Sequence, residues 1–123
     1  MTRVLHIALV QDWQQALAAG RYETSTRGLT LAQQGFIHCS TRRQAEGVFA
    51  RFYHDLPTEE LRLLVVDEQQ CAAQGTPMRW DEVPGSDLPF PHFYGPIPVP
   101  AVVAVLEFAG AELPDVSGYD VAP

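Results

Sequence analysis

Lysine does not occur in this 123-residue chain, and all eight of its basic residues are arginine. This absence excludes Schiff-base catalysis on a lysine and the phosphate-binding lysine of a Walker-type loop. Cysteine is also scarce, because Cys39 and Cys71 lie far apart and fit no C-x-x-C pattern. Since no secretory signal is recognisable either, we expect both thiols to be reduced and the protein to be cytoplasmic.

Long apolar runs and familiar catalytic motifs are missing too. No segment approaches the roughly 18–20 apolar residues that a membrane span requires, so we expect no membrane role. The sequence contains no G-x-S-x-G, G-x-G-x-x-G or H-E-x-x-H string, and its four histidines show no metal-ligand spacing. We therefore expect no metal cofactor.

Charge is unevenly distributed along the chain. The formal net charge is −7, but residues 1–56 hold six arginines against four acids, whereas residues 57–123 hold two arginines against eleven acids. An acidic chain disfavours an extended nucleic-acid face, although a local arginine pocket can still hold one phosphate. The acidic second half leaves open a docking role on a basic protein partner.

Hydrophobic periodicity predicts a single α+β domain. Strands are expected at 3–10, 36–40, 61–67, 78–83 and 101–108, and helices from Asp12 to a stop at Gly20, at 29–34 and at 41–55. The run 61–67 is apolar enough for a buried central strand. Strands outnumber helices without alternating regularly with them, which favours the α+β class. We place the domain at residues 1–110 and expect the acidic segment 111–123 to be frayed.

Two histidines are expected to face one cleft. In the first strand, Leu5 and Ile7 predict the core face, which puts His6 on the opposite face. In the strand at 36–40, Cys39 predicts the core face and puts His38 opposite. If the strands are neighbours, both imidazoles line one cleft, and histidine is the side chain most easily tuned for proton transfer near neutral pH. The alternative is that each is a partly buried strand residue bonded to the backbone.

The junction at residues 40–43 is a candidate anion site. Ser40 is suited to cap the following helix, but Arg42 and Arg43 lie in its first turn, where the helix dipole disfavours cations. A bound phosphate or carboxylate would compensate by using free N–H groups together with Arg42. The alternative is that both arginines point to solvent, where the penalty is screened.

The segment Phe90–Pro96 is an aromatic, proline-stiffened loop. Its His92 and Tyr94 are two residues apart and face the same way if the segment is extended. Arg79 and Trp80 add a cation and a stacking surface. We interpret the segment as one wall of a binding site, with a hydrophobic lid as the alternative.

Three strings carry a family resemblance: Leu5-His6-Ile7, the segment 31–40 with G-F-I-H-C-S, and the segment 90–97 with P-H-F-Y-G-P. Together with Arg79-Trp80, they resemble the bacterial family called Domain of Unknown Function 952 over residues 3–108. That family is similar to the ADP-ribosyltransferase-like superfamily, whose enzymes bind NAD in a cleft between two small antiparallel sheets. The resemblance implies a split-sheet fold, a nucleotide ligand such as NAD or ADP-ribose, and transfer of ADP-ribosyl or action on a ribose phosphate.

The resemblance also implies residue roles. His6 matches a first-strand histidine that contacts the NAD ribose, and the string around His38 resembles a V-H-L-S string that RNA 2′-phosphotransferases use on phosphate and ribose. Glu107 is the candidate for the late-strand acid that steers attack on the ribose. The expected catalytic residues are His38, His92 and Glu107. The expected ligand-binding residues are His6, Ser40, Arg42, Arg79, Trp80 and Tyr94. The competing hypothesis is a non-catalytic binding or interaction module that kept the cleft and lost transferase activity.

Overall fold

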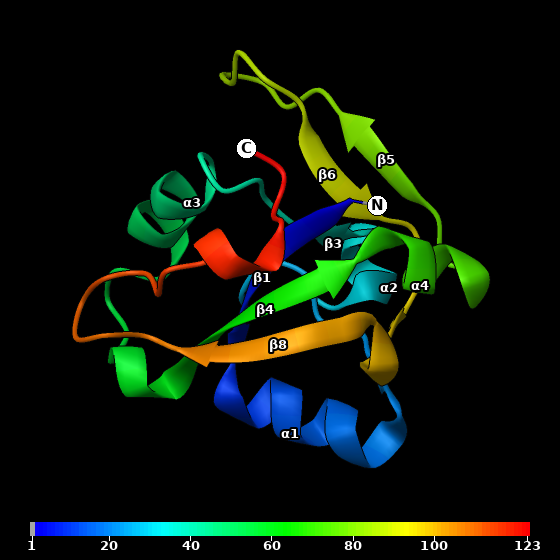
Figure 1. Cartoon of the computed structure of the whole chain (residues 1–123), viewed down its shortest axis with the longest axis horizontal. Helices are drawn as coiled ribbons and strands as arrows, with labels where there is room; N and C mark the ends of the chain where they lie inside the picture. The colour runs from blue at the N-terminus through cyan, green and yellow to red at the C-terminus, as the bar shows by residue number, and fades with distance from the viewer. Residues whose placement is uncertain (1) are drawn as a thin grey trace.

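Antiparallel sheets form the framework of the computed structural model, which describes residues 2–123 (Figure 1). The sheet with strand order β1-β4-β8 consists of β1 (Arg3–Leu9), β4 (Leu61–Asp67) and β8 (Val102–Glu107). The sheet with order β3-β6-β5 consists of β3 (Ile37–His38), β6 (Phe90–Phe93) and β5 (Met78–Asp81). A two-stranded sheet pairs β2 (Arg21–Tyr22) with β7 (Ile97–Pro98). The expected α+β domain with antiparallel sheets is confirmed.

Short helices surround the sheets. They are α1 (Val10–Ala19), α2 (Leu31–Gln34), α3 (Ala45–Phe52) and α4 (Glu68–Ala73), with 3₁₀ turns at Thr58–Glu60, Val99–Ala101 and Ser117–Tyr119. The predicted stops at Gly20 and Gly35 are confirmed, because both glycines have left-handed φ angles of 84° and 92°. Within residues 2–123, no helix is long and apolar enough to cross a membrane.

Strand β4 lies at the centre of its sheet, as the sequence predicts. It is antiparallel to β1 on one side and to β8 on the other. Its two faces enter two different hydrophobic cores, with Leu64 and Val66 in one and Leu63 and Val65 in the other. The sheet is therefore covered on both faces, which accounts for the continuous apolar run of β4.

Helix α3 begins later than the sequence predicts. The N–H and C=O groups of Ser40 both bond to Leu5 at 2.8 Å, so the chain is still extended at Ser40, which does not cap the helix. Thr41 and Gln44 then exchange side chain to backbone hydrogen bonds of 3.0 and 3.3 Å in the turn that precedes Ala45. These reciprocal bonds satisfy backbone donors that the helix leaves unpaired.

The segment 111–123 differs from the frayed tail that its composition predicts. Val116 and Val121 are buried in the core, and Val121 forms a parallel bridge with Arg3. The N–H of Ala122 donates to the carbonyl of Arg3 at 2.9 Å, and its carbonyl accepts from the N–H of Arg42 at 2.9 Å. Two apolar side chains and this backbone pairing anchor the segment, a non-local effect that an acidic, proline-containing stretch does not reveal.

We predict that Val121→Ala lowers the free energy of unfolding by about 1.5–2.5 kcal/mol, because it removes two buried methyl groups and leaves a cavity. Urea unfolding at 25 °C measures the change. Glu112→Ala, at an exposed side chain of the same segment, is the control and should stay within about 0.5 kcal/mol of wild type. Equal stability of the two variants would contradict the packing described for this segment.

Candidate functional site

A cavity of about 510 Å³ lies between α3 and one face of the β3-β6-β5 sheet. The loop of residues 82–89, which joins β5 to β6, supplies a further wall through residues 83–86. Figure 1 shows this loop projecting from the sheet on the side where α3 lies. Gln44 links these walls, since its side-chain amide donates to the carbonyl of Pro89 at 2.8 Å. His38 and His92 line the cavity on the sheet side.

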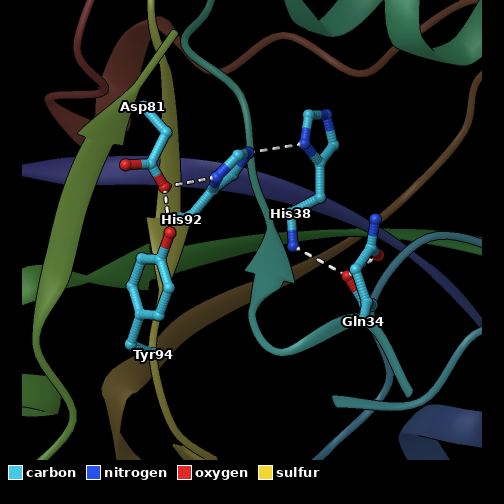
Figure 2. A network of polar contacts seen from close by, with 6 residues as sticks. Gln34, His38, Asp81, His92 and Tyr94 are labelled. Atoms are coloured by element: carbon cyan, nitrogen blue, oxygen red, sulfur yellow. Dashed lines mark hydrogen bonds and ion pairs between the residues drawn. The ribbon is translucent and has the colours of Figure 1, made fainter. Parts of the chain in front are cut away.

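A row of hydrogen-bonded side chains runs across this sheet (Figure 2). The β3–β6 register places His38 opposite His92, and the Nδ1 of His38 lies 3.0 Å from the Nε2 of His92. The Nδ1 of His92 lies 2.8 Å from Oδ2 of Asp81 on β5. The hydroxyl of Tyr94 donates to the same carboxylate oxygen. The row therefore connects an acid on one strand with an imidazole at the cavity wall.

The titratable groups of the row have shifted pKa values. Burial lowers the pKa of His38 to about 4, with the neighbouring His92 adding to the effect. Burial also lowers the pKa of His92, although the hydrogen bond to Asp81 opposes this. The hydrogen bond from Tyr94, followed by that from His92, lowers the pKa of Asp81. At neutral pH, both imidazoles are therefore neutral and the carboxylate is ionised.

A second set of polar contacts fixes the backbone of His38. Its N–H donates to the hydroxyl of Ser25 at 3.1 Å, and that hydroxyl donates to the side-chain oxygen of Gln34. Phe36 stacks on the ring of His92 with centroids 4.0 Å apart, and Phe90 lies 4.9 Å from the ring of His38. Both imidazoles are therefore packed as well as hydrogen-bonded.

His6 does not open into the cavity, contrary to the expectation of one shared cleft. Its side chain is 3% exposed, and its Nδ1 donates to the carbonyl of His38 at 2.7 Å. Its Nε2 accepts a hydrogen bond of 2.9 Å from the hydroxyl of Tyr22. The void beside His6, His38 and Ser40 measures about 10 Å³, which is too small for any ligand beyond one water molecule. The alternative of a buried histidine bonded to the backbone is the correct one.

The arginines that line the cavity are Arg43 and Arg51, and Arg42 does not reach it. Arg42 is exposed, and its backbone N–H already donates to Ala122. This N–H is therefore not free to bind an anion in the way that the sequence suggests. Ser40 is 2% exposed and also lies away from the cavity.

The expected second wall is only partly formed. Arg79 lies over the ring of Tyr94, with its guanidinium carbon 5.0 Å from the ring centroid, and neither residue lines the cavity. Trp80 pairs with Pro91, one position away from the pair of Arg79 with His92, so its side chain points to the opposite face of the sheet. Tyr94 thus contributes to the site through its hydrogen bond to the Asp81 carboxylate, and Trp80 lies outside the site.

Glu107 lies apart from the histidines. It is exposed on β8 and pairs in register with Arg62 of β4, whereas His38 and His92 belong to the other three-stranded sheet. Cys39 faces the core, as predicted, and burial raises the pKa of its thiol well above the usual range. Among residues 2–123, no group of three or more His, Cys, Asp or Glu side chains is placed to hold a metal ion.

Four contributors to the site are missed by sequence reasoning: Gln34, Gln44, Arg51 and Asp81. Asp81 is the most important of them, because it is the acid at the end of the histidine row. Alternation along β5 puts it on the same face as Arg79, a signal that the sequence carries. Its position beside His92 depends on the register of β5 against β6, in which Asp81 pairs with Phe90, and the eight-residue loop between the strands does not fix that register.

The sequence matches the model of a family described as Protein of unknown function (DUF952) over residues 7–105. The chain belongs to this DUF952 family. The fold is similar to the crystal structure of protein CC0527 from Caulobacter crescentus, with a TM-score of 0.73. The two sequences are 28% identical, and the match covers 93% of this DUF952 chain and 94% of the CC0527 chain. The solution structure of CC0527 is 29% identical over 88% and 85% of the two chains, with a TM-score of 0.66. No curated protein matches the sequence.

The buried His6 of this DUF952 domain predicts acid sensitivity. Burial lowers the pKa of His6 from 6.5 to about 4. Between these pH values, His6 is protonated in the unfolded chain and neutral in the folded chain. Stability is therefore complete above pH 6.5 and is lost as pH falls toward 4, by about 1.4 kcal/mol per pH unit. We predict that wild type loses about 2–3 kcal/mol more than His6→Gln between pH 7 and pH 4.5.

Urea unfolding at the two pH values measures this difference. His54→Gln, at an exposed histidine, is the matched control and should retain the wild-type pH dependence. The same loss of stability in wild type and His6→Gln would show that His6 is not the group responsible.

Proposed function

We propose that this DUF952 domain binds a nucleotide-class ligand, such as NAD or ADP-ribose, in the cavity beside α3. The main support for the proposal is the positive charge of the side chains that line the cavity. Arg43 and Arg51 line it, whereas none of the described residues that line it is acidic, although the chain has a net charge of −7. Guanidinium groups bind phosphate through charge-assisted and often bidentate hydrogen bonds.

The apolar lining supports a ligand with a planar base. Phe36, Phe52 and Phe90 lie among the lining residues. Aromatic rings stack well on purine and nicotinamide rings, and 510 Å³ lies within the usual range for small-molecule sites, about 300–1,000 Å³. A ring that carries phosphates satisfies the aromatic and the cationic parts of the lining together.

The spacing of the two arginines supports an extended anion. Arg43 precedes α3 and Arg51 lies in its last turn. Their backbones are therefore separated by about 12 Å along the helix axis. Arg51 also lies beside an aromatic lining residue, with its guanidinium carbon 5.4 Å from the centroid of the Phe52 ring. A linked diphosphate uses this spacing better than a single small anion does.

ADP-ribosyl transfer has less support than binding. The resemblance to ADP-ribosyltransferases requires an acid beside the ribose, and Glu107 lies on the other sheet. Asp81 is adjacent to His92 and does not itself line the cavity. This arrangement favours a binding domain over a transferase of that type.

Ligand affinity tests the binding proposal. We predict that wild type binds NAD or ADP-ribose and that Arg43→Ala or Arg51→Ala weakens binding by about ten-fold or more, because each loses a charge-assisted contact. Isothermal titration calorimetry gives the dissociation constants, with a 2′-phosphorylated ribonucleotide as a third ligand. Arg42→Ala, at the exposed neighbour of Arg43, is the control and should bind as wild type does. Absence of binding to all three ligands, or an equal loss in Arg42→Ala, would refute the proposal.

Turnover of NAD separates binding from transfer. We predict equal and negligible rates for wild type and Glu107→Gln, because Glu107 lies outside the cavity. Release of nicotinamide, followed by liquid chromatography, is the measurement. A wild-type rate that falls in Glu107→Gln would instead support the transferase.

A further inference from the structure

The hydrogen-bonded row that ends at the cavity wall determines which nitrogen atoms carry protons. The carboxylate of Asp81 accepts at Oδ2 from the hydroxyl of Tyr94 and faces Nδ1 of His92 at 2.8 Å. An ionised carboxylate offers only acceptor positions, so Nδ1 of His92 must carry the hydrogen. In a neutral imidazole, the other nitrogen is then an acceptor.

The protonation of His92 in turn determines that of His38. Nε2 of His92 accepts, so Nδ1 of His38, 3.0 Å away, must donate. Nε2 of the neutral His38 therefore carries a lone pair and no hydrogen. The ring of His38, which ends the row in Figure 2, belongs to a residue that lines the cavity, so the row presents a proton acceptor to any ligand there.

We propose that His38 accepts a proton from a hydroxyl group of the bound ligand, and that His92 and Asp81 form a relay that takes up the resulting positive charge. The proposal rests on the proposed function for the class of ligand, a nucleotide whose ribose bears the hydroxyl. His38 is the residue that touches the ligand in this account. His92 and Asp81 are positioning residues.

The proton movements balance along the row. The O–H bond of the ligand breaks, an N–H bond forms at Nε2 of His38, and the oxygen keeps the electron pair. The hydrogen on Nδ1 of His38 moves to Nε2 of His92. His92 is then an imidazolium ion, whose Nδ1–H still donates to the Asp81 carboxylate. The reverse movements return the proton.

The surroundings of His38 explain why it needs a relay. Burial is the main factor that disfavours a positive charge on His38, and His92 on β6 and His6 on β1 add to it. Arg43, which precedes α3, and Arg51 on α3 also line the cavity. Asp81 on β5 is the anion in the row, and it contacts His92 instead of His38. Transfer of the charge to His92 places it in an ion pair with the Asp81 carboxylate.

Histidine ring ¹⁵N NMR on the full chain at pH 7, without ligand, tests the relay directly. We expect His38 and His92 both to carry the hydrogen on Nδ1 and to leave Nε2 unprotonated. A hydrogen on Nε2 of His38 in wild type would overturn the proposal, because that atom would then be unable to accept one.

Asp81→Asn tests the role of the carboxylate. Loss of the anion should lower the pH at which the His38–His92 pair takes up its first proton by about one unit or more. Asp87→Asn, at an exposed acid of the loop that joins β5 to β6, is the matched control and should titrate as wild type does. An unchanged titration in Asp81→Asn would leave Asp81 a purely structural role and refute the relay.

Addition of ADP-ribose separates this proposal from the proposed function. Binding that shifts the Nε2 resonance of His38 supports both. Binding that leaves this resonance unmoved refutes proton acceptance by His38 and retains the nucleotide site. If ADP-ribose, NAD and the 2′-phosphorylated ribonucleotide all fail to bind, the proposed function fails and, with it, the assignment of a ribose hydroxyl as the proton donor.

Discussion

The pairing of His38 with His92 across β3 and β6 is the contact on which the candidate site depends. Strand β3 is only two residues long, so its position cannot come from a long ladder of backbone bonds. Contacts to the backbone of His38 fix it instead: Ser25 accepts from its N–H, and the buried His6 donates to its carbonyl. His6 thus contributes to the site by holding the residue that lines the cavity, although it never reaches the cavity itself.

Charge segregation is the second constraint on the site. The chain carries more acids than bases, yet the described residues that line the cavity include arginines and no acid. Asp81 is set behind His92, where its carboxylate satisfies the imidazole and the hydroxyl of Tyr94. An acid in the cavity itself would neutralise Arg43 or Arg51 and repel an anionic ligand. The arrangement keeps the electrostatic support of a carboxylate while leaving the cavity cationic.

Local signals account for what the sequence predicts well. The apolar run of β4, the left-handed stops at Gly20 and Gly35, and the outward face of His38 follow from residue type and spacing alone. Features set by distant contacts are not predictable in this way. Ser40 looks like a helix cap until its backbone is seen paired with Leu5, and Asp81 is identified only once β5 is paired with β6.

His6 shows most clearly where alternation stops being informative. Alternation correctly assigns His6 to the face opposite Leu5, but it does not say what covers that face. In this fold β1 is buried on both sides, and the face of His6 meets a second core that contains Trp13 and Tyr22. Strands β1 and β4 therefore have no face free for a ligand. A ligand site needs an uncovered face, and the face of the β3-β6-β5 sheet that carries His38 and His92 meets this need, since its strands leave a cavity beneath α3.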